Sequence, residues 1–301
     1  MSTASAVGRV WVGISGYNYP GWRGVFYPRE LPARRWLEYA SRQFNSIELN
    51  GTFYSLKSPA VFRRWAAETP AVGFTLAIKG SRFITHNLKL GRATTPLGNF
   101  YGSGILALGK KTGPFLWQLP PTWHFNPARV EEFLRLLPRD TADAARLARR
   151  HDARLKHGAV LTPVATMRYR HAFEPRHPSF FRPEFYDLLR SHDAALVIAD
   201  TAGKYAMVEE LTADFVYVRL HGSTQLYASD YTDTELDAWA SRIAQWRDAG
   251  RDVYVYFDND ALGHAPRNAR DLAARLNLSS EAPGRFPGIK RTGTRSAKSA
   301  V

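Results

Sequence analysis

The segment Asp214–Gly222, DFVYVRLHG, alternates in character with a period of two residues, as a β-strand does. One face of this strand carries three aliphatic side chains, and the other carries Tyr217, Arg219 and His221. Packing alone does not explain an arginine and a histidine on one face at the end of a strand. The segment therefore predicts a strand that delivers polar groups to a site.

The same kind of segment recurs along the chain. We predict eight strands, at Arg9–Gly16, Asn45–Tyr54, Gly73–Gly80, Gly113–Pro120, Ala172–Arg176, Ala194–Thr201, Asp214–Gly222 and Asp252–Asp258. We predict helices between and after them, at Ala33–Gln43, Pro59–Glu68, Pro127–Leu137, Pro183–Arg190, Thr234–Ala249 and Pro266–Leu276. Eight strands, each followed by a helix or an irregular crossover, predict an α/β fold with a single (β/α)8 TIM-barrel-like domain.

A doubly wound open sheet is the alternative to a barrel. Such a sheet would need a glycine-rich phosphate-binding turn between its first strand and a helix, and GISGYNYPGW does not supply one. Two stretches interrupt the alternation of strands and helices. Residues 81–100 are predicted to form an irregular loop. The basic insertion at about 138–170 is predicted to contain a helix near 144–158, with either a solvated basic face or a role as an electropositive flap over the barrel mouth.

The formal net charge of +14 is partly local. Residues 279–301 are basic and rich in Gly, Pro, Ser and Ala, which predicts a disordered tail after a barrel domain that spans 1–278. The remaining positive charge fits either solubility or an anionic partner, such as nucleic acid or a phosphorylated substrate. Through the tail we expect only weak, non-specific, salt-sensitive association with nucleic acid.

The cellular setting is predicted from what the chain lacks. It contains 0 Cys, so disulfides, thiolate metal sites and cysteine nucleophiles are excluded. The N-terminal residues do not read as a secretory signal, and no apolar run is long enough for a transmembrane helix. We therefore expect a cytoplasmic protein with no membrane partner. The sequence leaves its oligomeric state open.

Polar side chains gather at the predicted strand ends. Alternate side chains of a barrel strand point into the lumen, and active sites lie at the carboxyl ends of the strands. By this parity the candidate catalytic residues are Glu48, Glu174, His221 and Asp258. The candidate substrate-binding residues are Asn50, Tyr54, Lys79, Gln118, Arg176, His177, Asp200, Arg219, Tyr256 and Asn259. Because buried charges are costly unless paired, so many at one mouth predict a functional pocket.

The mixture of charges indicates the chemistry. The candidate carboxylates and histidines could hold a divalent metal ion, as in a metal-dependent hydrolase or isomerase. Lys79, Arg176 and Arg219 lie among them, however, and would compete with a metal. We therefore predict no metal, and an anionic, phosphate- or carboxylate-bearing small molecule as substrate, held by these three cations. One of the candidate carboxylates or His221 would move the proton.

The reaction class stays open between hydrolase, lyase and isomerase. A glycosidase-like pair of carboxylates is one alternative, although the sequence does not give their separation. A nucleic-acid-binding or nucleic-acid-processing protein is another. No cofactor is predicted, because the chain has no dinucleotide-binding fingerprint, no Walker-type loop and no thiolate.

Six motifs in order resemble the YecE-like family, a family named for a domain of unknown function (number 72). They are VGISGYNYPGWRGVFYP, FNSIELNGTFY, WQLPP, FEPRHPSF, YVRLHG and VYVYFDND, within Val10–Leu276. The resemblance implies a TIM-barrel-like fold and no established activity. Residues that match the family motifs are Glu48, Asn50, Thr52, Phe53, Tyr54, Gln118, Glu174, Arg176, His177, Arg219, His221, Asn259 and Asp260.

The chain also departs from the family pattern at three positions. Ile14 stands where threonine is common, and Tyr17 stands where tryptophan is common. Pro175 lies inside the Glu–Arg–His motif. Because proline cannot donate to a strand ladder, Pro175 predicts an irregular fifth strand.

Overall fold

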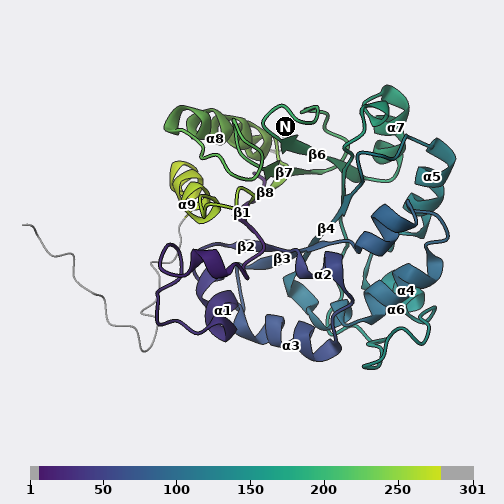
Figure 1. Ribbon diagram of the computed structural model, residues 1–301. Helices are drawn as coiled ribbons and strands as arrows, with labels where there is room; N and C mark the ends of the chain where they lie inside the picture. Colours follow the sequence, from purple (N-terminus) through teal and green to yellow (C-terminus); the bar gives the residue numbers. More distant parts are fainter. Residues whose placement is uncertain (1–6, 279–301) are drawn as a thin grey trace, which may run out of the picture.

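The eight predicted strands close into a parallel barrel in which each strand pairs with its neighbours in chain order (Figure 1). The computed structural model describes residues 7–278, so the predicted tail lies outside the described residues. The strands are β1 (Val10–Ser15), β2 (Ser46–Leu49), β3 (Thr75–Lys79), β4 (Thr112–Gln118), β5 (His171–Glu174), β6 (Ala194–Asp200), β7 (Phe215–Leu220) and β8 (Asp252–Phe257). The predicted TIM-barrel-like fold is confirmed.

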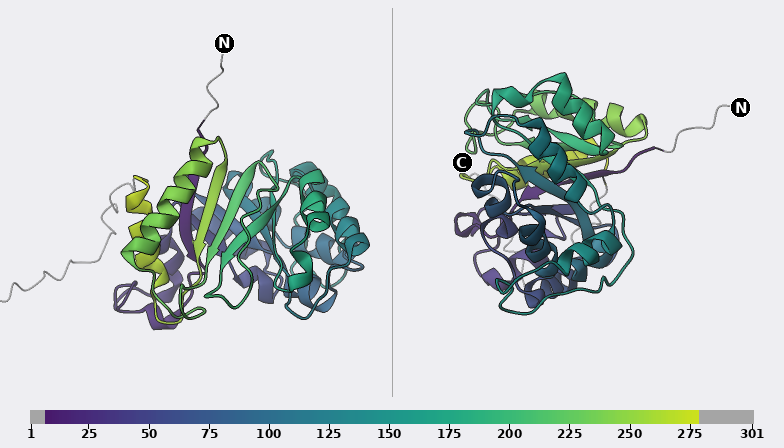
Figure 2. Two further views of the ribbon diagram at one scale, coloured as in Figure 1. Left: turned by 90° about the horizontal axis from the view of Figure 1, so that it is seen from above. Right: turned by 90° about the vertical axis from the view of Figure 1, so that its right-hand side faces the viewer.

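Helices surround the barrel, as the two views of Figure 2 show. The α-helices are α1 (Trp36–Ala40), α2 (Gly51–Tyr54), α3 (Pro59–Glu68), α4 (Thr94–Gly102), α5 (Pro127–Leu136), α6 (Thr141–Ala148), α7 (Pro183–Ser191), α8 (Asp233–Asp248) and α9 (Ala265–Arg275). Short turns of other helix types are η1 (Pro20–Trp22), η2 (Ala33–Arg35), η3 (Phe83–Asn87), η4 (Ile105–Ala107), η5 (Gly109–Lys111) and η6 (Pro178–Phe180). Between residues 7 and 278, no helix is long and apolar enough to cross a membrane.

Helix starts follow the sequence signals closely. Proline opens α3, α5 and α7, where its missing N–H is not needed. The Asn126 side chain caps α5 by accepting from the backbone N–H of Arg129. Thr232 and Glu235 form a reciprocal capping box at the start of α8. These local signals explain why most predicted helices agree with the structure to within one or two residues.

Three predicted elements differ from the structure. The predicted strand over 45–54 ends at Leu49, where the Thr52 hydroxyl folds back onto the Leu49 carbonyl at 2.8 Å and α2 begins. The loop predicted over 81–100 contains η3 and most of α4. The helix predicted near 144–158 starts earlier, as α6, and ends at Ala148. Residues 154–158 continue irregularly and lie beside residues 56–59.

The loop predicted over the region of α4 is wrong because glycine is a poor helix former. The helix packs along α6, and a Cβ at Gly98 would lie within 2.9 Å of the backbone of the segment that follows α6. Glycine is therefore used here for close approach between segments, although it weakens an isolated helix.

Strand pairing is regular at β5 despite Pro175. The strand ends at Glu174, just before the proline, and its pairs with β4 and β6 run in continuous register. A register shift occurs instead between β3 and β4, between Leu76 and Ile78. The proline thus ends the strand rather than distorting it.

The interior of the barrel is filled below its mouth. The side chains that fill it are those of Ala77, Leu116, Ala172, Ala195, Val197, Ala199, Phe215, Tyr217, Tyr254 and Tyr256. Near the amino ends of the strands, Trp11 stacks on Tyr254 with ring centroids 4.4 Å apart. Higher up, the Tyr256 hydroxyl lies 2.6 Å from Ser46 Oγ. Polar and charged side chains replace these rings only at the carboxyl ends.

Candidate active site at the carboxyl end of the barrel

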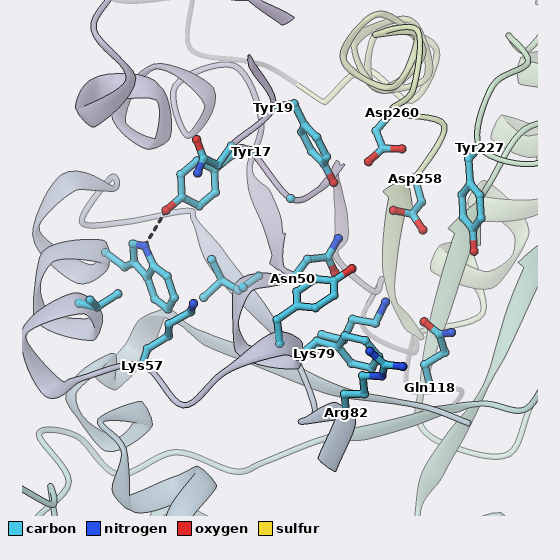
Figure 3. A pocket seen from close by; sticks show the side chains of 18 of the residues that line it. Tyr17, Tyr19, Asn50, Lys57, Lys79, Arg82, Gln118, Tyr227, Asp258 and Asp260 are labelled. Atoms are coloured by element: carbon cyan, nitrogen blue, oxygen red, sulfur yellow. Dashed lines mark hydrogen bonds between the residues drawn. The ribbon is translucent and has the colours of Figure 1, made fainter. Parts of the chain in front are cut away.

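A pocket of about 840 Å³ opens at the carboxyl ends of the strands (Figure 3). The predicted site residues that line it are Asn50, Tyr54, Lys79, Gln118 and Asp258. Asn50 and Asp258 directly follow β2 and β8, and Lys79 and Gln118 are the last residues of β3 and β4. The strand ends therefore bring these side chains together from distant parts of the sequence.

Beneath the pocket lies a buried ion cluster centred on Arg219. Its guanidinium donates to Glu48 at 2.9 Å, to Glu174 at 2.7 Å and to Asp258 at 2.9 Å. Arg219 and Glu48 are completely buried, and Glu174 is 1% exposed. A further bond from Arg219 reaches the Ser15 hydroxyl at 3.0 Å. The guanidinium is thus surrounded by acceptors from four strand ends.

Tyrosine, histidine and arginine side chains complete the ion cluster. The Tyr217 hydroxyl donates to Glu48 at 2.6 Å, and Arg176 donates to Glu174 at 3.0 Å. His221 Nδ1 lies 2.9 Å from Asp258 Oδ2, while its Nε2 lies 3.3 Å from an Arg219 nitrogen. His221 therefore lies between the Asp258 carboxylate and the Arg219 guanidinium.

Opposite charges keep the cluster carboxylates ionised. Burial alone would raise the pKa of Glu174, but Arg219 and then Arg176 lower it to about 2. Burial likewise opposes ionisation of Asp258, whose pKa is nevertheless held well below its ordinary value by Arg219 and His221. Asp258 therefore presents a permanent negative charge to the pocket.

The cluster does not support the predicted role of Arg219 as an anchor for a substrate anion. Its side chain is buried beneath the pocket, and three carboxylates already use its N–H groups. Glu48, Glu174 and His221 belong to the same buried layer and do not line the pocket. Arg219 and His221 contact Asp258 directly, and Glu48 and Glu174 hold Arg219 in place beneath it.

Two predicted binding residues, Asp200 and Asn259, point away from the mouth. Alternate alanine and valine side chains of β6 fill the barrel, so Asp200 faces outward and accepts from the Tyr231 hydroxyl at 3.0 Å. Asn259, two residues beyond the end of β8, also faces outward. Its amide donates to the Ser229 carbonyl and to Asn268, both at 2.9 Å, and so ties down the loop that leads to α9.

Two other predicted binding residues lie outside the pocket for different reasons. Tyr256 does face the barrel interior, but it lies a layer below the ion cluster and is fully buried. His177 follows Pro175, where the chain has already left the barrel. Its Nδ1 accepts from the Ser179 backbone N–H, and its ring packs against that of His124 with centroids 3.9 Å apart.

Several pocket residues were not selected from the sequence. The most notable is Asp260, whose pKa is raised to about 6 by burial and then by the neighbouring Asp258 carboxylate. It faces Tyr19, which also lines the pocket. The DND motif at the end of β8 was a signal for Asp260, since the match to the family motifs already included it.

Cationic and aromatic residues from loops were also missed. Lys57 and Arg82 line the pocket, and neither forms an ion pair within residues 7–278. Tyr227, in the loop after β7, has a positive φ of 64° and accepts from Arg176 at 3.0 Å. Loop residues follow no strand parity, so their positions had no sequence signal of the kind that found the barrel residues.

Lys79 differs from the other buried charges. It is 8% exposed, and its ammonium forms no hydrogen bond or ion pair within the described chain. The Phe53 ring lies 4.8 Å from Nζ. Burial and then the positive charge of Arg219 lower the pKa of Lys79 to about 8, against the opposing influence of Asp258 and the other cluster carboxylates.

The donor set offers no ready cage for a metal ion. Among the described residues, no group of three or more His, Asp or Glu side chains is arranged to hold one. The physical reason is that Arg219 occupies the point on which Glu48, Glu174 and Asp258 converge.

Comparisons with known proteins agree with the sequence motifs. The family model described as "Protein of unknown function DUF72" matches residues 11–291. UPF0759 protein YunF of Bacillus subtilis (strain 168) is 20% identical over 298 residues, covering 89% of this chain and 95% of YunF. UPF0759 protein YecE of Escherichia coli (strain K12) is 27% identical over 133 residues, covering 41% of this chain and 46% of YecE.

The likeness extends to a solved structure. A DUF72 family protein from Thermotoga maritima has a TM-score of 0.71 and 26% identity, covering 89% of this chain and 99% of that one. The match of the family model over nearly the whole chain confirms the resemblance seen in the motifs: the protein belongs to the DUF72 family.

Proposed function

We propose that the protein is an enzyme that acts by general acid/base catalysis on an anionic small molecule bound in this pocket. The observation that carries the proposal is the combination of a carboxyl group with a raised pKa, Asp260, and two cations without carboxylate partners, Lys57 and Arg82. A carboxyl that titrates near neutral pH suits proton transfer, and unpaired cations suit an anion.

The charge balance of the pocket favours an anion. Its lining contains the cations Lys57, Lys79 and Arg82, and also Arg64, which pairs with Glu68 at 3.7 Å, against the two carboxylates Asp258 and Asp260. Asp258 is already compensated from below by Arg219. The Lys57 ammonium donates to the Ser55 hydroxyl at 2.8 Å. The surplus positive charge therefore faces the open part of the pocket, where it would attract a phosphate or carboxylate group.

Two adjacent carboxyl groups have different properties, as acid/base pairs in enzymes do. Asp258 stays ionised because of Arg219 and His221, and its charge in turn helps to raise the pKa of Asp260. We assign Asp260 as the group that carries the proton and Asp258 as the fixed negative charge beside it. In this assignment Glu48, Glu174 and His221 act by holding Asp258 in place.

The anion-binding part of the proposal predicts which small molecules bind. Inorganic phosphate, sugar phosphates and small carboxylates should raise the melting temperature and bind measurably in calorimetry, and neutral sugars should not. Replacing Lys57 or Arg82 with Ala should weaken binding about 10-fold each, because each removes one charge-assisted contact.

Lys110→Ala is the matched control, since Lys110 precedes β4 at the opposite end of the barrel and is exposed. Equal binding of neutral compounds, or no effect of either pocket variant, would contradict the anion site. Binding of single-stranded oligonucleotides at physiological salt that depends on Lys57 would favour the nucleic-acid alternative.

The acid/base part predicts opposite effects of Asp260→Asn on activity and stability. Once screening identifies a substrate, turnover should fall about 100-fold or more, because the proton carrier is lost. The folded-state pKa of Asp260 is raised to about 6 from 3.8, so this carboxyl costs stability as the pH rises through 6. The variant should therefore be more stable at pH 8 by about 1 kcal/mol, after allowance for partial exposure, and unchanged at pH 3.

Urea unfolding at the two pH values measures the stability effect, and it also shows that any lost activity does not come from unfolding. Turnover that survives in Asp260→Asn would remove Asp260 from the mechanism.

A further inference from the structure

We propose that Lys79 is a covalent catalytic residue that forms a Schiff base with an aldehyde or ketone group of the substrate. The inference deepens the proposed function and rests on it for the anionic group: the substrate class becomes an anion that also carries a carbonyl. It would also narrow the reaction class to isomerases and lyases.

The first support is that the Lys79 ammonium has no hydrogen-bond or ion-pair partner among residues 7–278. The contrast with Lys111 is direct, because the Lys111 ammonium donates to the Thr69 carbonyl at 2.7 Å, to the Thr69 hydroxyl at 3.1 Å and to the Ala66 carbonyl. A lysine kept for stability makes such bonds. The Lys79 ammonium makes none within the described chain, although it is more deeply buried.

The second support is the direction in which the amine points. Lys79 ends β3, and in Figure 3 its Nζ is directed into the pocket, toward Gln118 and Asp258. The Phe53 ring lies beside Nζ and shields it from water. Because the Lys79 backbone belongs to a strand, the side chain starts from a more firmly held position than a loop would give, as nucleophilic catalysis requires.

The third support is the proton affinity of the amine. With a pKa of about 8, roughly a tenth of the Lys79 side chains are uncharged at pH 7, against fewer than about 1 in 1,000 for an ordinary lysine. The charged groups that act on it are Arg219, Asp258, Glu48 and Glu174, and His86 also lies close. Only the uncharged amine has the lone pair that attacks a carbonyl carbon.

The atoms balance without any outside oxidant or reductant. The Nζ lone pair forms a bond to the carbonyl carbon, and the carbonyl oxygen takes a proton from protonated Asp260, which gives a carbinolamine. The nitrogen loses a proton, the hydroxyl gains one, and water leaves, so that amine and carbonyl become an imine and one water. The protonated imine then draws electrons from a neighbouring C–H or C–C bond, and Asp260 accepts the released proton. The permanent charge of Asp258 stabilises the cationic imine.

The pocket separates the two groups that the substrate must carry. In Figure 3, Lys57 lies on the far side of the pocket from Asp258 and Tyr227, and Lys79 lies between them. A molecule with an anionic group at one end and a carbonyl toward the other would contact both lysines.

The test is chemical trapping with glyoxylate, the simplest anionic aldehyde, and sodium borohydride, read out by peptide mass spectrometry. Reduction would leave a carboxymethyl group on each lysine that formed an imine. At pH 7 we expect labelling of Lys79 at least about 10-fold faster than that of Lys110, an exposed lysine in the same chain. Propanal, a neutral aldehyde, should label Lys79 more slowly than glyoxylate does.

The outcomes distinguish the two proposals. Labelling of Lys79 no faster than Lys110 would overturn the Schiff base, while binding of inorganic phosphate that depends on Lys57 would leave the proposed function standing. Glyoxylate and propanal could also label Lys79 equally fast, with no effect of Lys57→Ala. That result would support the Schiff base and contradict the proposal that the substrate is an anion. Lys79→Met should abolish the label. Because the wild-type rates decide the question, the test does not depend on that variant folding.

Discussion

Replacing Arg219 with Met is expected to destabilise the protein by about 3 to 5 kcal/mol, enough to unfold many domains of this size. The substitution removes the cation that compensates Glu48, Glu174 and Asp258, and leaves three carboxylates buried together. The sequence alone suggested the opposite result, a folded protein that loses only ligand binding. Urea unfolding followed by far-UV circular dichroism measures the difference.

Two further variants isolate the cause. Adding Glu48→Gln and Glu174→Gln to Arg219→Met should restore part of the lost stability, because the uncompensated charges are removed with their partner. Arg168→Met is the matched control: Arg168 also bridges two carboxylates, Asp193 and Asp214, but its side chain is 59% exposed. Arg168→Met should lower the free energy of unfolding by less than about 1 kcal/mol. If Arg219→Met were equally mild, the cluster would not be what holds the barrel mouth together.

The second large effect is a loss of stability in acid. The pKa of Glu174 is lowered from 4.5 to about 2 in the folded state, so its contribution is present above pH 4.5 and is lost as the pH falls toward 2. Glu174 alone should account for about 3 kcal/mol over this range. Asp258, whose pKa is also lowered, adds to the loss in the same direction.

Unfolding free energies measured at pH values from 2 to 5 test this directly. Glu174→Gln should be less stable than the wild type at pH 7. Its unfolding free energy should also depend less steeply on pH, because about one fewer proton is taken up on unfolding in acid. Glu184→Gln is the control, because Glu184 is exposed on α7 and forms no ion pair within the described residues. A wild-type stability that stays constant down to pH 2 would show that the cluster carboxylates are not ionised by their partners.

The fold could be predicted because its signal is local and repeated. Most strands carry a period of two residues, and several helices carry their own start signal. On β2, β7 and β8, strand parity also selected the inward residues correctly, including Glu48, Arg219 and Asp258. At Asp200 the last polar residue of a strand was assumed to face inward, without counting back to the side chains that fill the barrel. Asn259, expected at the rim beyond the last strand, bonds to Ser229 and Asn268 instead.

Which charged residues pair with one another and which face the pocket could not be predicted from the sequence. Sequence shows that Arg219 and three carboxylates share a mouth, but not that they neutralise one another. That depends on distances between strands that are far apart in the chain. Lys57 and Arg82 were missed for a related reason, because loops fold over the mouth without any repeating pattern.

The packed interior of the barrel has a kinetic consequence. Below the ion cluster, aromatic and aliphatic side chains down to Trp11 and Tyr254 fill the barrel, and within residues 7–278 they leave no second opening along its axis. Whatever reaches Lys79 must leave by the same mouth through which it arrived. Under the proposed function, a product and the next substrate exclude each other, so inhibition by product should be competitive, and release should precede each new turnover.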